Sequence, residues 1–147
     1  MPSFDPARLD LANYAHQIFV ETRFQDLDPL GHINNVALAG IFENGRVRFN
    51  HEMTHSTARP SAGERWLVAR VEVNYLAEAH FPAPILIGNA IGQIGNRSWQ
   101  ILSVAFQNDR PVGLCDSTLV YQSSQGKSAI SDILRAKLET LRLRTLR

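Results

Sequence analysis

Cysteine is nearly absent from this sequence of 147 residues, where Cys115 is the only one. A single cysteine excludes an intrachain disulfide and any metal site built from several cysteines, and it favours a cytoplasmic location. The sequence has no apolar run near the roughly 18 residues of a membrane span, and its charged N-terminal stretch does not resemble a signal peptide. An excess of charge is also lacking: the formal net charge is +1, which argues against a nucleic-acid partner.

Apolar residues are plentiful enough for a folded core, at 44% hydrophobic against 20% charged. This composition is typical of globular proteins, and the length fits one domain with no room for a second. We therefore predict a single domain over residues 1–147. Residues 1–15 are polar and contain Pro2 and Pro6, so we expect them to form a loose N-terminal arm.

Alternation of apolar and polar residues predicts five strands, and turn residues separate several of them. Gly95-Asn96 and Asn108-Asp109 are the expected hairpin turns. The predicted strands lie within residues 16–24, 67–77, 85–94, 98–106 and 112–122.

Two helices complete the prediction. Residues 34–55 lack proline, and Asn34 or Asn35 can cap a long helix there. Its first half is apolar nearly all round, which predicts burial on most sides by a sheet that wraps it. A leucine repeat predicts a second helix within 129–147, capped by Ser131. Strand, long helix, antiparallel meander and surface helix together indicate an α+β domain.

The segment RFQDLDPLGHINN, residues 23–35, gathers polar residues at a turn that opens the long helix. A helix start offers unpaired N–H groups and a partial positive charge, which can stabilise an oxyanion. A carboxylate beside them, from Asp26 or Asp28, can attack a carbonyl or activate water. The alternative is ordinary turn chemistry, with Asp28, Pro29 and Gly31 at the positions preferred in a type I turn.

Residues 23–49 resemble the signature of hot-dog-fold acyl-CoA thioesterases of the 4-hydroxybenzoyl-CoA thioesterase type. The similarity continues through YLAEAHFPAPILIG at 75–88 and IGNRS at 94–98. The resemblance implies a curved five-stranded antiparallel sheet around one long central helix, and hydrolysis of an acyl-CoA without a metal or other cofactor. It also implies a homodimer that shares each active site between subunits, or a homotetramer.

The resemblance also assigns roles to residues. Asp28 matches the catalytic carboxylate, as nucleophile or general base, and backbone amides near Gly31 or His32 would polarise the thioester carbonyl. His32 or Asn35 would orient water or substrate. Glu43 on the long helix is a further candidate carboxylate, with an ion pair to Arg46 three residues later as the alternative. The turn that contains Arg97 and Ser98 matches the family turn that meets the coenzyme A phosphates. Leu38 and the Pro82–Pro84 loop depart from the family pattern, so the acyl specificity stays open.

Two other functions compete with the thioesterase. One is a hot-dog module that binds acyl-CoA without hydrolysing it. The other is a zinc peptidase, because His51-Glu52-Met53-Thr54-His55 matches the HExxH pattern. The extended form of that pattern is absent, since Ala58 and Ser61 replace its Gly and His. Glu64, Glu72, Glu78 and His80 are the candidates for a third zinc ligand, although we expect no metal.

Overall fold

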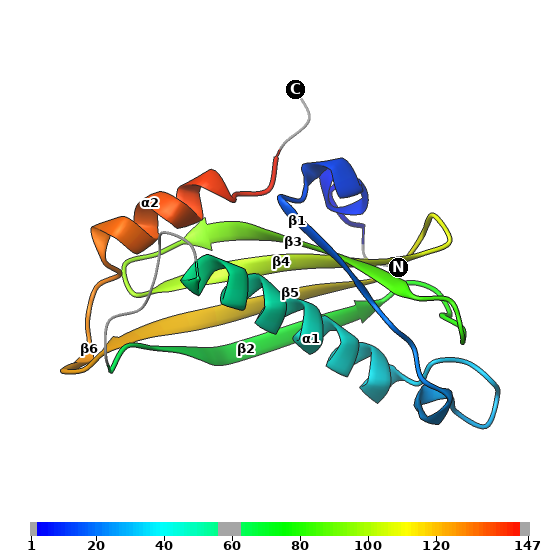
Figure 1. The fold of residues 1–147 in the computed structure, drawn as a ribbon. Coiled ribbons are helices and arrows are strands. Elements are labelled where there is room, and N and C mark those ends of the chain that lie inside the picture. The colour runs from blue at the N-terminus through cyan, green and yellow to red at the C-terminus, as the bar shows by residue number, and fades with distance from the viewer. Residues whose placement is uncertain (1–2, 56–62, 145–147) are drawn as a thin grey trace.

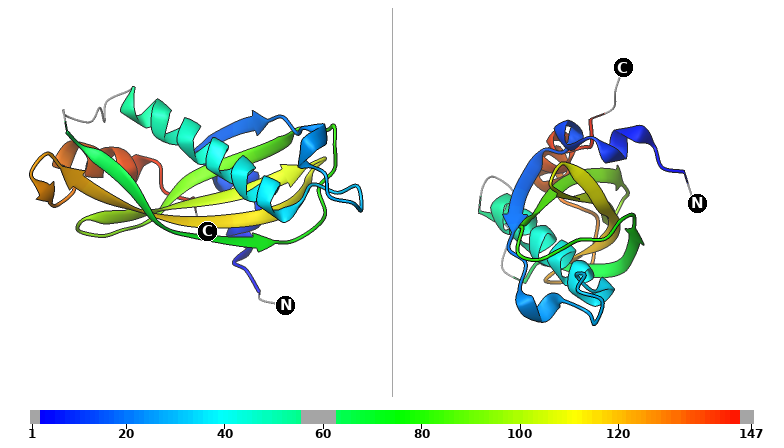
Figure 2. Two further views of the ribbon diagram at one scale, coloured as in Figure 1. Left: turned by 90° about the horizontal axis from the view of Figure 1, so that it is seen from below. Right: turned by 90° about the vertical axis from the view of Figure 1, so that its right-hand side faces the viewer.

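The computed structural model describes residues 3–55 and 63–144, which form one antiparallel sheet with a long helix across it. The helix, α1 (Asn35–Thr54), lies along the concave side of the curved sheet (Figures 1 and 2). The predicted α+β architecture is confirmed, and a two-residue strand joins the five that were expected. The strands run in the order β1 (His16–Val20), β3 (Ile85–Ile94), β4 (Ser98–Gln107), β5 (Arg110–Ser123) and β2 (Arg65–Tyr75), with β6 (Gly126–Lys127) beside β5.

Two tight turns fix the strand register. Asn108 and Asp109 have φ of 51° and 62°, as a two-residue hairpin turn between β4 and β5 requires. The amide of Gly95 donates to the carbonyl of Ser98 at 2.8 Å and closes the turn between β3 and β4. Both predicted hairpins are therefore confirmed, and they leave β1 and β2 as the two edges of the sheet.

Helix α1 begins where the sequence predicted, because Asn34 Oδ1 accepts a hydrogen bond from the amide of Ala37 at 2.7 Å. Gly45 lets the helix approach the sheet closely: a Cβ atom there would lie 2.7 Å from Ile87 Cγ2. The prediction of burial on most sides is wrong for the outer face, where Val36 is 83% and Val47 57% exposed. The sheet covers the helix from one side only.

The C-terminal helix is shorter than the predicted 129–147. Helix α2 spans Asp132–Thr140, and Ser131 caps it as expected. The chain then leaves the helix because residues 141–143 bond to β3: the amide of Ile91 donates to the carbonyl of Leu141, and the amide of Leu143 to that of Ile91. Pairing with β3 beyond the end of β1 replaces further helical turns, and the leucine repeat alone could not show this competition.

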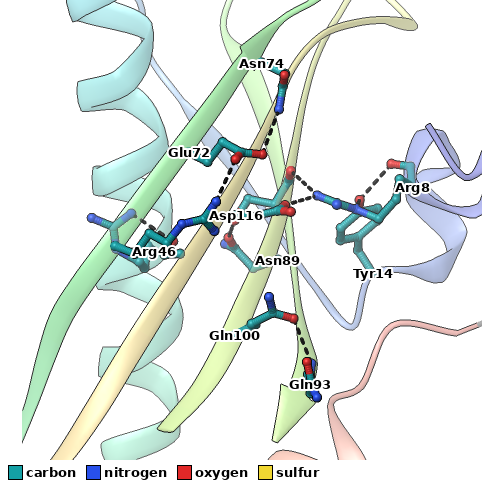
Figure 3. Close-up of polar contacts among 12 residues, drawn as sticks. Arg8, Tyr14, Arg46, Glu72, Asn74, Asn89, Gln93, Gln100 and Asp116 are labelled. Atoms are coloured by element: carbon teal, nitrogen blue, oxygen red, sulfur yellow. Dashed lines mark hydrogen bonds and ion pairs between the residues drawn. The ribbon is translucent and has the colours of Figure 1, made fainter. Parts of the chain in front are cut away.

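From residue 3 onward, the N-terminal arm is packed rather than loose, which corrects the prediction of a loose arm over 1–15; residues 1–2 lie outside the described residues. Its described part forms two short 3₁₀ helices, η1 (Pro6–Leu9) and η2 (Leu11–Asn13), against the convex face of the sheet. Tyr14 is 3% exposed there, and Arg8 forms an ion pair with Asp116 at 2.7 Å (Figure 3). The apolar members of the arm outweigh its polar character. They are Phe4, Leu9, Leu11 and Tyr14.

Candidate active site

The turn before α1 is built around the side chain of Asp28. Its Oδ1 accepts hydrogen bonds from the amides of Leu30 at 2.9 Å and His32 at 3.1 Å. The amide of Gly31 donates to the carbonyl of Asp28 at 3.0 Å, as in the predicted turn, and Gly31 has a φ of +83° that favours glycine. In the part of the chain that the structure describes, Asp28 Oδ2 makes no hydrogen bond. This oxygen is the one available for chemistry.

The amides of Gly31 and His32, which the family resemblance offered as oxyanion donors, are therefore already bound to Asp28. The amides of Ile33 and Asn34 are engaged as well, whereas those of Asn35 and Val36, which open helix α1, have no acceptor among the described residues. First-turn amides of a helix lack intrahelical acceptors and carry the positive end of the helix dipole. The amides suited to an oxyanion thus lie a few residues later than expected.

A cleft of about 290 Å³ brings the three predicted catalytic residues together. Asp28 and His32 enter it from the turn, and Asn35 from the start of α1. The opposite wall is formed by the end of β2 and the segment that follows it. The other lining residues are Ile33, Leu38, Tyr75, Leu76, Ala77, Glu78 and Ala79. The sequence prediction that Asp28, His32 and Asn35 meet at one site fits this geometry.

Two lining side chains contact the predicted residues directly. Glu78 Oε2 lies 3.2 Å from His32 Nε2, and the hydroxyl of Tyr75 donates to the carbonyl of Asn35 at 3.0 Å. The ring of His80 packs edge-on against His32, with ring centroids 5.3 Å apart. The histidine is therefore held from both sides, and the first residue of α1 is tied to β2.

Sequence reasoning did not place Tyr75 at this site, and it considered Glu78 and His80 only as zinc ligands. The resemblance of residues 75–88 to the family marked this segment in the sequence. It did not show which residues the segment contacts in the folded chain. The structure supplies these contacts because the amide of Ile33 donates to the carbonyl of Ala79 at 2.8 Å and joins the two segments.

Asp26, the other carboxylate of this segment, makes structural contacts. Its side chain is buried and accepts hydrogen bonds from the backbone amide of Arg23 at 3.0 Å and from the Arg23 guanidinium at 2.8 Å. Its carbonyl accepts from the amide and the side chain of Asn34, both at 2.9 Å. Asp26 thus fixes the residue that caps α1.

Arg97 and Ser98 lie at the other end of the sheet from Asp28. The carbonyl of Arg97 accepts from the amide of Tyr121, whose partner on β2 is Trp66, whereas the Asp28 cleft meets β2 at Tyr75. A strand of 11 residues that rises about 3.3 Å per residue separates these ends by roughly 30 Å. Within one chain, the structure does not bring Arg97 to the cleft.

The HExxH residues point in different directions. Glu52 pairs with His16 of β1 at 2.7 Å, while His51 and His55 stack on each other with ring centroids 3.9 Å apart. His55 Nδ1 also lies 2.9 Å from the carbonyl of His51. Among the described residues, no group of three or more His, Cys, Asp and Glu is placed to hold a metal ion. The contacts give this motif a role in packing and helix capping.

A second cleft, of about 200 Å³, surrounds the pair of His16 and Glu52. His16 stacks on Phe49, and its Nδ1 lies 3.2 Å from the side-chain nitrogen of Asn89. Burial lowers the pKa of His16, and the neighbouring Glu52 only partly opposes this effect. Both ring nitrogens of His16 are engaged, and the described lining of this cleft contains no residue from the first turn of a helix, unlike the cleft at Asp28.

Comparisons with known proteins identify the superfamily to which this chain belongs. Residues 22–138 match the family model of the thioesterase-like superfamily. Because the match covers most of the sequence, the chain belongs to this superfamily, in agreement with the resemblance seen in the sequence. No curated protein matches the chain. In the described helices, none is long and apolar enough to cross a membrane.

Solved structures share the fold over nearly their whole length. The PA5185 protein of Pseudomonas aeruginosa is 24% identical with a TM-score of 0.77, covering 92% of this chain and 96% of its own. A protein described as a predicted thioesterase from Bacillus stearothermophilus is 26% identical with a TM-score of 0.76, covering 88% and 98%. A Thermus thermophilus thioesterase is 23% identical with a TM-score of 0.74, covering 91% and 98%. The hot-dog fold is thereby confirmed.

Proposed function

We infer that this protein is a thioesterase that hydrolyses an acyl-CoA to the free acid and coenzyme A at the Asp28 cleft. Membership of the thioesterase-like superfamily supports thioesterase activity in general. The observation that carries the inference is the arrangement of Asp28, whose Oδ1 is held by two amides while Oδ2 faces no protein donor among the described residues. The Thermus thermophilus thioesterase of similar fold was crystallised with coenzyme A and zinc, which supports the CoA class of substrate.

Asp28 supplies the negative charge that the reaction needs. Attack of its free oxygen on the thioester carbon and removal of a proton from an attacking water both require an ionised carboxylate. In either route, the C–S bond breaks and the sulfur leaves as the thiolate of coenzyme A. In the first route, the attack leaves a mixed anhydride of Asp28 and the acyl group, which water then hydrolyses to the free acid and Asp28. In the second route, the oxygen of the attacking water ends in the acid. His32, held by Glu78, and the side chain of Asn35 are placed to orient the water or the thioester.

The start of α1 stabilises the charge that develops on the carbonyl oxygen. The unengaged amides of Asn35 and Val36 donate hydrogen bonds there, strengthened by the positive end of the helix dipole. Asp28 itself keeps the amides of Leu30 and His32 in place. Carboxylate and oxyanion donors thus come from one continuous turn, which positions them without a metal.

Arg97 can serve this site only from a second copy of the chain. Strand β2 is an edge of the sheet, and Val68 and Val71 on it are each 48% exposed. Antiparallel pairing of two β2 edges would hide these side chains and bring the Arg97 end of one chain to the Asp28 end of its partner. A planar guanidinium there suits the phosphates of coenzyme A, with Ser98 beside it. The active assembly is accordingly a homodimer.

Turnover of acyl-CoAs from short to long and aromatic tests the reaction itself. We expect at least one to be hydrolysed in a purified sample. Tight binding of acyl-CoA without hydrolysis of any of them would instead identify a non-catalytic binding module. Retention of full activity after treatment with a chelator is expected, since no step uses a metal.

A mixed dimer tests the shared site. When Asp28→Asn and Arg97→Ala chains are combined, one of the two sites receives an intact Asp28 from one chain and an intact Arg97 from the other. At low substrate concentration, the mixture should therefore exceed the mean activity of the two parent variants. No gain on mixing would place Arg97 outside the partner's site.

A further inference from the structure

The cleft beside Asp28 is negatively charged as well as apolar. Two carboxylates line it, Asp28 and Glu78, and no lysine or arginine is among its described lining residues. The Glu78 carboxylate is 64% exposed and sits within salt-bridge distance of His32. The rest of the wall is uncharged. It consists of Ile33, Asn35, Leu38, Tyr75, Leu76, Ala77 and Ala79.

Nearby basic groups do not cancel this charge inside the cleft. Arg110 is close, but its guanidinium donates to the backbone carbonyl of Glu78 at 2.8 Å and is not part of the lining. His32 is the basic side chain within the lining, and Glu78 already faces it. His80 contacts His32 through the edge of its ring and stays outside the lining. Within the described lining of this chain, a third negative charge would meet two carboxylates and no lysine or arginine.

The acyl group has no route away from these carboxylates beneath helix α1. The layer between α1 and the sheet is filled by buried side chains, including Leu38, Phe42 and Ile87. Gly45 approaches Ile87 so closely that even a methyl group would not fit between helix and strand. An acyl chain attached at Asp28 therefore cannot pass beneath the helix, and the space left beside Asp28 within this chain is the cleft that Glu78 lines.

We propose that Glu78 is a specificity residue, which makes the enzyme select acyl groups with an uncharged end and reject those that end in a carboxylate. This inference rests on the proposed thioesterase function. A like charge at this short distance is repelled, most strongly where apolar walls exclude water. Specificity of this kind arises from repulsion of the wrong substrate as much as from attraction of the right one.

The test compares two substrates of equal chain length, hexanoyl-CoA and adipoyl-CoA, by their kcat/KM values. In the parent protein, we expect the value for adipoyl-CoA to be at least about tenfold lower. The variant Glu78→Gln should raise the ratio of adipoyl-CoA to hexanoyl-CoA at least about threefold, because an uncharged amide does not repel the carboxylate. Added salt should raise the ratio in the parent, since Glu78 is partly exposed.

The ratio of the kcat/KM values for the two substrates distinguishes a specificity role of Glu78 from a role in positioning His32. If Glu78 only oriented His32, Glu78→Gln would slow both substrates equally and leave the ratio unchanged, which would overturn the proposal. Glu139→Gln is the matched control: it removes the same charge from a side chain of α2 that pairs with Arg142 outside the cleft, and it should leave the ratio as in the parent. Absence of hydrolysis with every acyl-CoA would overturn the thioesterase function together with this inference.

Discussion

Asp28 and His32 are joined through the backbone: Asp28 Oδ1 accepts from the amide of His32 at 3.1 Å, and the amide of Asp28 donates to the carbonyl of His32 at 2.8 Å. The proposed catalytic carboxylate is thus held by its own turn rather than by a basic side chain. Such a carboxylate keeps one oxygen fixed and the other unengaged, which suits attack or water activation.

Asp28→Asn tests this role directly. The amide oxygen of asparagine can still accept from Leu30 and His32, so the turn should keep its shape while the negative charge is lost. We expect kcat for the best acyl-CoA to fall at least ~100-fold, the lower limit for loss of a general base. Binding of acyl-CoA, measured by calorimetry, should persist. Turnover near that of the parent would show that Asp28 is not the catalyst.

Asp26→Asn is the matched control, because it removes the same charge two residues away. Asp26 is buried and receives three hydrogen bonds from Arg23 that are within 3.2 Å. Its loss should lower the free energy of unfolding by about 1–3 kcal/mol. The folded fraction should keep kcat within a few-fold of the parent.

Tyr75→Phe tests whether the start of α1 must be anchored. The Tyr75 hydroxyl donates to the carbonyl of Asn35, whose amide is a proposed oxyanion donor. Without this bond, the donor is less firmly placed, and small displacements of catalytic groups are costly. We expect kcat to fall roughly 3–10-fold with little change in KM. Tyr14→Phe, on the convex face, should leave kcat unchanged, and an unchanged kcat in Tyr75→Phe would show that the anchor is dispensable.

Much of this site could be predicted from the sequence because its key part is local. The turn from Asp26 to Asn35 is specified by residues within ten positions of one another. Asn34 caps the helix by accepting a hydrogen bond from the amide of Ala37, three residues later. Contacts across the fold were harder to predict. Glu78 meets His32 only because separate segments are joined at Ile33 and Ala79, and no periodicity in either segment encodes that pairing.

The same distinction between local contacts and contacts across the fold explains where the prediction of the fold was wrong. The strands, the hairpins and the span of α1 follow from alternation and capping, which act over a few residues. Residues 3–15 and 141–143 were misjudged because their conformation depends on the sheet that they pack against. Exposure of Val36 and Val47 on α1 reflects the single-sided cover that one chain provides.

Arg8→Ala tests how strongly the N-terminal arm is held. The ion pair between Arg8 and Asp116 has side chains only 13% and 27% exposed, and the pair of Arg70 and Glu72 has the same 2.7 Å length but is about half exposed. Removing one partner of a mostly buried pair leaves a charge unpaired, so Arg8→Ala should cost about 1–3 kcal/mol in urea unfolding. Arg70→Ala should cost less than about 1 kcal/mol. Equal losses of unfolding free energy in the two variants would show that burial of the Arg8–Asp116 pair adds nothing to the stability.

His16 should make the stability of the fold depend on pH. Burial lowers its pKa below the usual value of about 6.5, despite the opposing effect of Glu52. The geometry agrees: Asn89 donates to the carbonyl of Gly45 and accepts from the hydroxyl of Ser103, so its side-chain nitrogen also faces His16 Nδ1 as a donor. A proton on Nδ1 would place two donors face to face.

Between the folded and unfolded pKa values of His16, the unfolded chain binds a proton that the folded chain does not. Stability from this residue is therefore complete above about pH 6.5 and is lost as the pH falls below it, with a slope of at most about 1.4 kcal/mol per pH unit. Urea unfolding of the parent and of His16→Gln from pH 8 to pH 5 measures how the free energy of unfolding depends on pH. The variant should be less stable at pH 8 and show a shallower decline towards pH 5, because glutamine does not titrate. Parallel curves for the two proteins would assign the acid sensitivity to other groups.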